Sequence, residues 1–491
     1  MSAPPTQLRG ITRRQALNYF GASATCVTVP ELAWSMTKTP LQETVAGYAR
    51  DLAGGQPVTL RLLMPNGSGG NVAPVIAAFK KMTGIEIETV ETPVDEITVE
   101  LLLTTLSNAQ QFDLALPATF GLPDLVAANA IQPITGFSER YEPPGFRDDI
   151  LFGLGDQFDD HLYGFQTDGD AYMMFYHKGM LESTDEKARY ADTFGQPLSV
   201  PLTWQDLDQQ MGFFNRPDES QWGGLLFRTP GYLAWEWWVR FHAKGVWPFS
   251  PEMEPQIASD QGVEALEELI RATEALCPEA LTLGLFDNWS RYSKGDVYCN
   301  IGWGGSQKYF NSNVSAMRGN MIHGPTPGGV VDGTLISTPY FNWGWNYVVP
   351  SNSRHAELSY LFALFAATPA MSTLAVQQAD GFFDPFRPEH YENSEIQSAY
   401  TTDFLDVHRA SMENAIPDLY LQGQGEYFRI LSEWLVRALA REVTPQLALE
   451  RVAQRWRLIT NSSGMHVQKQ RWAKLRSKYP KKLRATLRDF S

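Results

Sequence analysis

The chain has 491 residues, which is too long for a single hydrophobic core and therefore predicts at least two lobes. Hydrophobic residues make up 43% of the chain and charged residues 19%, as in an ordinary globular protein. The formal net charge of −15 argues against a surface whose main task is to bind nucleic acid.

Phenylalanine, tyrosine and tryptophan together make up 12% of the chain, and several tryptophans stand close together. Core packing is the ordinary role of such residues, and we expect most of them to fill it. Aromatic faces also suit sugar rings, whose C–H faces are apolar while their hydroxyls are polar. The composition is therefore compatible with a carbohydrate site.

The three cysteines, Cys26, Cys277 and Cys299, do not have the spacing of a metal site, and neither a metal nor a cofactor is expected. Cys277 and Cys299 either pair in an oxidising compartment or remain as two buried thiols. No apolar run reaches the roughly 18 residues that a membrane-spanning helix requires.

Residues 1–36 are predicted to form an export signal. Paired arginines, Arg13 and Arg14, precede a mildly apolar stretch at 17–29, which resembles a twin-arginine signal. Such a signal would carry the folded chain to the periplasm. Two alternatives stay open, a disordered arm on a cytoplasmic protein and a lipoprotein signal at Cys26.

The first part of the chain alternates strands and helices. Residues 58–64 and 112–116 are typical of strands, and the apolar face of residues 74–84 predicts a helix between them. This rhythm predicts an α/β fold whose parallel or mixed sheet carries helices on both faces. The glycine-rich loop at 65–71 lacks the Lys-Ser/Thr pair of a phosphate-binding loop, so nucleotide binding is excluded there. The loop is either a tight turn or a strand-end loop that offers Asn66 to a ligand.

The stretch at 163–178 is predicted to lead the chain from one lobe into the other. Its first part is polar, with Asp168 and Asp170 on either side of Gly169. Its second part, residues 171–176, is an unbroken apolar run, which predicts a strand buried on both faces. Because ligand clefts form where lobes meet, the two carboxylates are candidate ligand contacts.

Later segments add helices, aromatic residues and one basic region. Thr203 predicts an N-capped helix, and a buried strand at 296–302 opens onto Trp303. Residues 324–333 are rich in proline and glycine, which predicts a linker. Residues 468–491 carry nine Lys and Arg, which predicts a solvated helix or a disordered end.

The order of several short motifs resembles a known family. The motifs are Met-Thr-Gly-Ile at 82–85, Phe-Asp-Leu at 112–114, Tyr-Gly-Phe-Gln followed by Phe-Tyr-His-Lys-Gly-Met-Leu within 163–181, Pro-Leu-Thr-Trp at 201–204, and Trp-Gly-Trp-Asn-Tyr-Val-Val-Pro at 343–350. Over residues 57–462 the chain resembles the extracellular solute-binding proteins of ABC transporters, family 1, which are maltose-binding-protein-like.

The resemblance implies an α/β fold of the two-lobed periplasmic binding protein type II class, with mixed sheets flanked by helices and a hinge between the lobes. It implies that lobe 1 contains residues 57–166 and 335–385 and that lobe 2 contains residues 167–334 and 386–462, with 463–491 as a basic C-terminal tail. It also implies that the lobes close around a ligand and that the closed form docks on a membrane permease.

The resemblance further implies a site for a neutral sugar or polyol in the cleft between the lobes, with Asp170 as an acidic contact. Together with Asp168 from the crossing, the expected ligand-binding residues are Asn66, Phe120, Asp170, Tyr232, Trp235, Trp303, Trp343, Trp345 and Tyr427. The expected partners are the carbohydrate or polyol and the subunits of an ABC permease, with no nucleic acid. The protein is expected to be a periplasmic monomer and not an enzyme.

Two other functions remain open at this point. A carbohydrate-active hydrolase would use a carboxylate pair such as Asp168 and Asp170, although the sequence places no second acid across a substrate. A binding protein for a cationic amine would use the same aromatic residues and acidic charge. No nucleophile elbow or zinc-protease motif is present.

Overall fold

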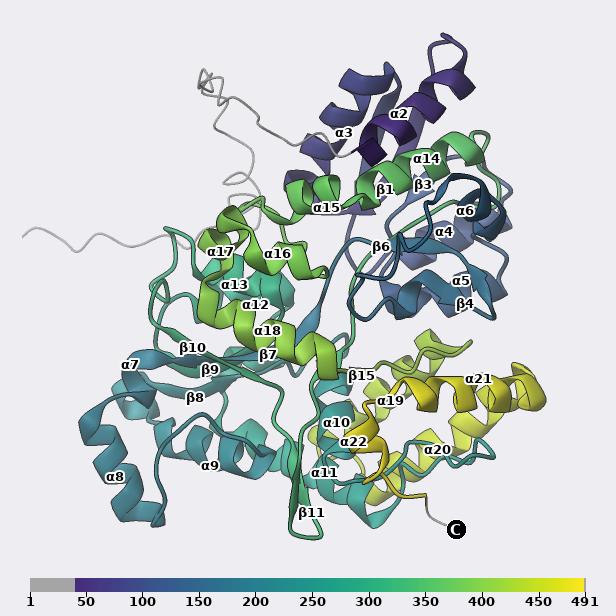
Figure 1. The fold of residues 1–491 in the computed structure, drawn as a ribbon. Helices are drawn as coiled ribbons and strands as arrows, with labels where there is room; N and C mark the ends of the chain where they lie inside the picture. The colour runs from purple at the N-terminus through teal and green to yellow at the C-terminus, as the bar shows by residue number, and fades with distance from the viewer. Residues whose placement is uncertain (1–39, 490–491) are drawn as a thin grey trace, which may run out of the picture. The chain divides into compact units, whose positions relative to one another are not determined.

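Two mixed β-sheets organise the computed structural model, which describes residues 40–489 (Figure 1). The export signal expected at 1–36 and the lipoprotein alternative at Cys26 lie outside the described residues. The α/β architecture with mixed sheets and flanking helices, predicted from the sequence, is confirmed.

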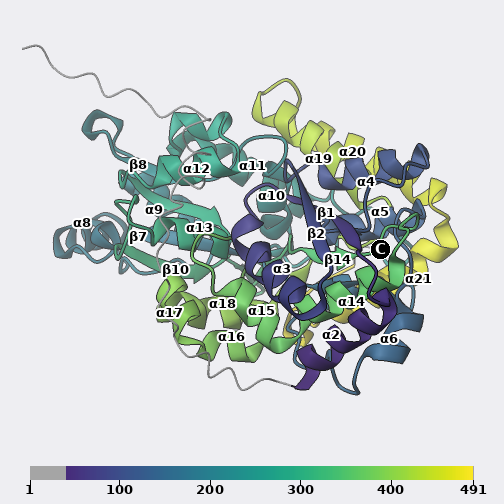
Figure 2. The same cartoon turned by 90° about the horizontal axis from the view of Figure 1, so that it is seen from above.

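The first sheet has the strand order β2-β1-β3-β14-β6. These strands are β1 (Thr59–Pro65), β2 (Glu86–Thr92), β3 (Leu114–Ala115), β6 (Gly164–Gln166) and β14 (Asn346–Val348). β1 runs parallel to β2 and β3, whereas β14 is antiparallel to β3 and β6. One side of the sheet carries α3 (Gly69–Thr83) and α14 (Ala356–Ala367), and the other carries α4 (Ile97–Leu106) and α5 (Leu122–Ala127) (Figure 2).

Helix α3 shows why the sequence pattern predicted this layer. Val72, Val75 and Phe79 share one buried face that packs into the core. The helix ends at Gly84, whose φ of 78° is left-handed and whose N–H donates to the carbonyl of Lys80. The helix begins before Pro74, which lies inside its first turns.

The second sheet is built around β7 (Ala171–His177), the strand predicted from the apolar run. Its order is β15-β13-β7-β9-β8, and β10 also pairs with β7. The other strands are β8 (Trp222–Leu225), β9 (Val297–Gly302), β10 (Met321–Pro325), β13 (Tyr340–Phe341) and β15 (Ile416–Pro417). The first six residues of β7 are buried, as expected for a central strand with neighbours on both edges.

Further elements complete the described chain. The helices are α2 (Pro40–Ala53), α6 (Thr135–Tyr141), α7 (Lys178–Leu181), α8 (Thr184–Phe194), α9 (Trp204–Phe214), α10 (Leu233–His242), α11 (Asp260–Ala272), α12 (Leu285–Tyr292), α13 (Gly304–Phe310), α15 (Pro369–Val376), α16 (Pro388–Glu392), α17 (Ser394–Tyr400), α18 (Thr402–Asn414), α19 (Gln424–Leu439), α20 (Pro445–Ser462), α21 (Met465–Lys478) and α22 (Lys481–Arg484). Two hairpins are formed by β4 (Gln157–Phe158) with β5 (His161–Leu162), and by β11 (Gly329–Val331) with β12 (Thr334–Ile336).

The chain passes between the two sheets at three places. Residues 167–170 lead from β6 to β7, and residues 342–345 lead from β13 back to β14. Residues 377–387 lead from α15, which contacts α3, to helices α16–α18 beside the second sheet. The first of these connections lies within the stretch at 163–178. The return, expected at residue 335, lies beyond β13, because β13 still pairs with β7.

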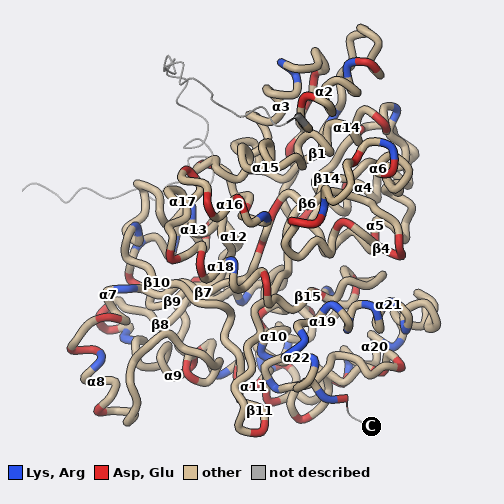
Figure 3. Tube along the Cα trace, viewed as in Figure 1, with Lys and Arg blue, Asp and Glu red and all other residues tan. Residues whose placement is uncertain are grey.

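Two segments differ from their sequence-based predictions. Residues 324–333, expected to be a linker, contain the end of β10 and the strand β11, because the prolines and glycines here lie in and between paired strands. The basic C-terminal segment forms α21 and α22, in which Lys and Arg recur (Figure 3). Its apolar residues, Trp472, Leu475 and Leu483, are buried.

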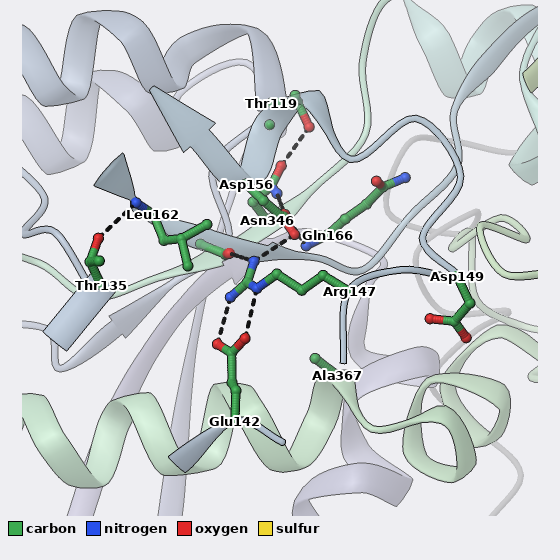
Figure 4. A network of polar contacts seen from close by, with 12 residues as sticks. Thr119, Thr135, Glu142, Arg147, Asp149, Asp156, Leu162, Gln166, Asn346 and Ala367 are labelled. Carbon is green, nitrogen blue, oxygen red and sulfur yellow. Dashed lines mark hydrogen bonds and ion pairs between the residues drawn. The ribbon is translucent and has the colours of Figure 1, made fainter. Parts of the chain in front are cut away.

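A buried polar network centred on Asp156 supports the strands next to the first crossing (Figure 4). Asp156 accepts hydrogen bonds from the backbone N–H of Gln166 at 2.6 Å and from the side-chain amide of Asn346 at 2.9 Å. Its second oxygen accepts from Arg147 at 2.7 Å, and Arg147 also binds Glu142 with two bonds. Because Gln166 lies on β6 and Asn346 on β14, the network fixes the two strands that lead into the crossings.

Within residues 40–489, Cys277 and Cys299 are both buried and form no disulfide. No single helix among the described residues is long and apolar enough to cross a membrane. Helices α14 and α15 meet that criterion only as a pair, which is bent by 70° at its break.

Candidate functional site: an aromatic pocket over three buried carboxylates

A pocket opens where the chain crossings meet, and its walls are largely aromatic. It is lined by Val94, Asp170, Leu285, Phe286, Trp289, Trp303, Gly305, Trp343, Trp345 and Phe382. Its cavity volume of about 30 Å³ has room for one or two water molecules. A sugar-sized ligand therefore requires the walls to move apart before it can enter.

The pocket walls come from segments that are far apart in the sequence. Asp170 belongs to the first crossing, and Trp343 and Trp345 belong to the second. Phe382 belongs to the third crossing, and α12 and the start of α13 add the remaining aromatic wall. Any relative movement of the two sheets therefore changes the shape of this pocket.

Asp170 is one of three carboxylates that converge beneath the pocket. Each of Asp168, Asp170 and Asp384 offers an oxygen that lies within 4.8 Å of the others. Asp168 and Asp384 have no exposed surface, and Asp170 is 7% exposed. A ligand in the pocket can therefore reach the carboxylate cluster through Asp170.

Backbone N–H groups hold these carboxylates in place. Asp168 accepts a hydrogen bond from the N–H of Asp384 at 2.5 Å, and Asp170 accepts one from Gly344 at 3.3 Å. Asp384 accepts from the N–H of Gly304 at 2.7 Å and from the hydroxyl of Tyr400 at 2.7 Å. The cluster therefore joins all three crossings to the start of α13.

Burial and mutual repulsion alter the acidity of the cluster. Burial, followed by the neighbouring Asp384, raises the pKa of Asp168 well above its usual value. Burial and then Asp168 raise the pKa of Asp170 in the same way, and burial raises the pKa of Asp384 to about 6. Lys308 lies nearby, and burial lowers its pKa to about 8.

A second layer of aromatic rings supports the pocket wall. The ring of Trp343 lies 5.0 Å from that of Trp235, 5.4 Å from that of Trp303, 5.6 Å from that of Phe120 and 6.1 Å from that of Tyr232. The contact with Tyr232 is stacked and the others are tilted or edge-on, and such contacts add to the stability of an aromatic cluster. Phe120, Tyr232 and Trp235 are therefore brought together behind the wall.

The indole N–H groups of the wall provide unused hydrogen-bond donors. Trp303 donates its indole N–H to the side chain of Asn342 at 2.9 Å. The indole N–H groups of Trp289 and Trp343 are buried and have no partner among the described residues. A buried donor without a partner is costly, so these groups are suited to a ligand with acceptor oxygens.

Two expected ligand residues lie away from this pocket. Tyr427 has no exposed surface, and its hydroxyl bonds to Thr460 at 2.7 Å within the contact between α19 and α20. Asn66 does not line the pocket, and its N–H donates to the carbonyl of Thr92 at 2.9 Å. The residue of that loop region that supports the pocket is Asn71, whose side-chain oxygen accepts from the N–H groups of Phe382 and Phe383.

Sequence reasoning missed Asp384, Phe382, Phe286 and Trp289 as members of the site. The turn Gly381-Phe382-Phe383-Asp384-Pro385 carried no specific signal, because glycine, aspartate and proline are all common in turns. For Phe286 and Trp289 on α12, the spacing of three residues put both on one helix face. That spacing does not distinguish a pocket wall from an ordinary core.

The arrangement can bind a small molecule that offers both donors and acceptors between flat apolar faces. The lining residues contain one carboxylate and neither Lys nor Arg, so the pocket provides no counter-charge for an anionic ligand. Asp170 accepts hydrogen bonds, the unpaired indoles donate them, and the rings cover C–H surfaces.

Comparison with known proteins gives a consistent picture. The sequence model of bacterial extracellular solute-binding proteins matches residues 75–402 of the chain. The fold is similar to that of an ABC transporter solute-binding protein from Agrobacterium radiobacter K84, solved with ribitol, with a TM-score of 0.70 and 18% identity over 82% of this chain and 99% of that one. It is also similar to maltose-bound MalE3 of T. maritima, with a TM-score of 0.70 and 15% identity over 82% and 99% of the two chains.

A third similar structure is a solute-binding protein from Agrobacterium vitis S4 with bound D-mannitol, at a TM-score of 0.68 and 16% identity over 83% of this chain and 99% of that one. At these identities the likeness establishes the fold. The two-lobed binding-protein architecture with mixed sheets flanked by helices is therefore confirmed.

Proposed function

Since the chain belongs to the bacterial extracellular solute-binding proteins, we propose that it binds a sugar or polyol in the aromatic pocket and delivers it to the permease of an ABC importer. The observation that carries this proposal is the composition of the pocket. One carboxylate, two unpaired indole N–H groups and several flat rings match a neutral ligand with hydroxyls on both edges. The similar structures named above hold ribitol, D-mannitol and maltose.

In the proposed site, Asp170 accepts ligand hydroxyls while Trp303, Trp343 and Trp345 provide the flat walls. Asp168 lies beside Asp170 in the buried carboxylate cluster. Phe120, Tyr232 and Trp235 pack against Trp343 and hold the wall in position. Asn66 and Tyr427 are left out of the proposed site because they make their contacts elsewhere. Closure around the ligand would exclude water and so strengthen each hydrogen bond.

We propose that residues 57–166 and 342–385 form one hinged lobe and residues 167–341 and 386–462 the other, because β13 still pairs with β7 and the chain returns to the first sheet at 342–345. The protein is proposed to be a monomer that a twin-arginine signal exports to the periplasm. Its other partner is the membrane permease, and nucleic acid is not a ligand.

The protein is proposed to bind without turnover. Glycoside hydrolases place two carboxyl groups about 5 Å or more apart on either side of a bond. Here Asp168 has no exposed surface and lies within 4.8 Å of Asp170, so it cannot act on the opposite face of a ligand. Unchanged oligosaccharide after prolonged incubation is the expected result, and product formation would favour the hydrolase instead.

A cationic amine is the second candidate ligand, because Asp170 under aromatic rings would also bind an ammonium group. Salt distinguishes the two, since the affinity for a cation falls with ionic strength while that for a neutral polyol does not.

A thermal-shift screen of the purified protein against sugars, polyols and amines tests the proposal. A specific ligand raises the melting temperature by mass action, and Asp170→Asn and Trp343→Ala should each remove that rise. Asp406→Asn changes an exposed acid on α18 and serves as the matched control. A ligand response that survives in both pocket variants would place the site elsewhere.

A further inference from the structure

The three buried carboxylates lack the positive charge that their burial requires. Asp168, Asp170 and Asp384 form no ion pair with any Lys or Arg within residues 40–489. Lys308 interacts electrostatically with Asp168 and Asp384, but its ammonium donates to three backbone carbonyls, at 2.9, 2.9 and 3.1 Å. An ammonium has three N–H donors, so Lys308 has none left for the carboxylates.

A simple charge count shows what is missing. Three ionised carboxylates carry three negative charges and Lys308 carries one positive charge, so two further positive charges make the site neutral. An uncompensated charge in a buried site is costly, by several kcal/mol or more. Either two protons or one divalent cation supplies the balance.

One carboxylate oxygen of the cluster gives a separate indication of a ligand. Asp168 Oδ2 is fully buried and has no hydrogen-bond partner among the described residues, although Asp168 Oδ1 accepts the N–H of Asp384. Buried polar atoms in native proteins are normally paired, and a bound ion is one explanation for an oxygen that has no partner.

We propose that a divalent cation of the calcium type binds between Asp168, Asp170 and Asp384. The site offers only carboxylate oxygens, and hard oxygen ligands select Ca²⁺ or Mg²⁺ over transition metals. Ca²⁺ accepts irregular sets of six to eight oxygens, whereas Mg²⁺ demands a near-ideal octahedron. The remaining positions can be filled from the pocket, because Asp170 lines it.

The position of this cation gives it a structural role. Its ligands come from the first and third crossings, and Gly344 of the second crossing donates to Asp170. A bound cation therefore ties all three connections between the sheets at one point.

The proposal does not depend on which organic ligand the protein binds, and it is tested with metal alone. The full-length protein is stripped with EDTA and titrated at neutral pH with CaCl₂, MgCl₂ or TbCl₃. We expect Ca²⁺ to raise the melting temperature saturably and more than Mg²⁺ does. Terbium luminescence excited through tryptophan should also appear, because Trp303 and Trp343 line the adjacent pocket.

Variants assign the response to the site. Asp384→Asn and Asp168→Asn should each weaken Ca²⁺ binding roughly tenfold or more, and Asp406→Asn should leave it unchanged. Circular dichroism checks that each variant is folded. A wild-type protein whose melting temperature and terbium signal do not respond to these metals overturns the proposal, whatever the variants do. An equal response in a folded Asp384→Asn variant overturns it as well.

Discussion

Gly169 shows how a single residue can govern the arrangement of the crossings. It lies between Asp168 and Asp170, and a Cβ built on it would lie 2.0 Å from the carbonyl oxygen of Pro385. The Cβ is fixed to the backbone of Gly169, and the carbonyl of Pro385 is itself backbone, so neither atom can rotate away. We expect Gly169→Ala to lower the free energy of unfolding by about 3 kcal/mol, measured by urea denaturation.

A matched glycine distinguishes this close approach from a general effect of the substitution. Gly212 lies within α9, and a Cβ there would meet no atom within 4 Å. Gly212→Ala should leave the protein as stable or make it more stable by up to about 1 kcal/mol, since alanine favours a helix. Equal effects at the two positions would contradict the proposed clash.

His408 provides a residue-scale prediction about pH. Its Nε2–H donates to the carbonyl of Gly169 at 2.8 Å, and its Nδ1 accepts from the hydroxyl of Tyr391 at 2.9 Å. Burial lowers the pKa of His408 from 6.5 to about 4. In the unfolded chain the ring takes up a proton near pH 6.5, so folding is increasingly penalised as the pH falls from there to about 4.

The variant His408→Gln should therefore lose less stability than the wild type over that pH range. The difference should approach roughly 3 kcal/mol at its acid end. Comparing the variant with the wild type cancels the opposite effect of the buried acids, which both proteins contain. Urea denaturation at several pH values measures the difference, and parallel curves would contradict the assignment.

The candidate site residues that were predicted from the sequence are those with a local pattern. Asp168 and Asp170 precede an apolar strand, and Trp303 follows one, so each could be placed at a strand end. Asp384 has no such neighbour, and it reaches the cluster only through a fold in which β7 and the third crossing meet. Long-range convergence of this kind leaves no periodicity in the sequence.

At the scale of elements, the sequence predicted best where one face of a helix or a whole strand is buried. The capping box of α9, with Thr203 and Asp206 bonded to each other's backbone, is an example of a strong local signal. Strand β10 was missed because its proline and glycine resemble a linker, while its pairing with β7 is a tertiary feature. Strand β11 forms a local hairpin with β12, and its Asp332-Gly333 turn is a sequence signal that the linker prediction overlooked.

Helix α21 yields a prediction about the C-terminal region. Trp472 has no exposed surface, and its indole N–H donates to the carbonyls of Phe249 at 3.2 Å and Ser250 at 3.0 Å. Its ring also packs against Trp247. We expect Trp472→Ala to cost about 3–5 kcal/mol in thermal or urea unfolding, because it leaves a cavity and two unpaired carbonyls.

The exposed neighbour Gln470 on the same helix is the control. Gln470→Ala should change the free energy of unfolding by less than about 0.5 kcal/mol. If Trp472→Ala also left the free energy of unfolding unchanged, α21 would be a solvated helix, as the composition of the basic segment first suggested.

At the scale of the whole molecule, the sequence predicted two sheets and a crossing but not how many contacts would join the two halves away from the hinge. One such contact is Asp124 on α5, which accepts from the N–H groups of Gly423 at 2.5 Å and Gly425 at 3.0 Å at the start of α19. Others join α21 to the β4–β5 hairpin, through the pairs Arg471–Asp159 and Lys474–Asp160.

If the two halves hinge at the crossings, the contacts of Asp124 hold them together on one side of the pocket. Asp124→Ala removes two charge-assisted hydrogen bonds, so the open form should become more populated and the protein less stable by about 1–2 kcal/mol. Small-angle scattering should then show a larger radius of gyration without ligand, and a ligand found in the screen should bind more weakly. Asp406→Ala, which removes an exposed carboxylate, should change neither quantity. An Asp124→Ala variant that scatters like the wild type would mean that α5 and α19 do not move apart, and the hinge would then have to lie elsewhere.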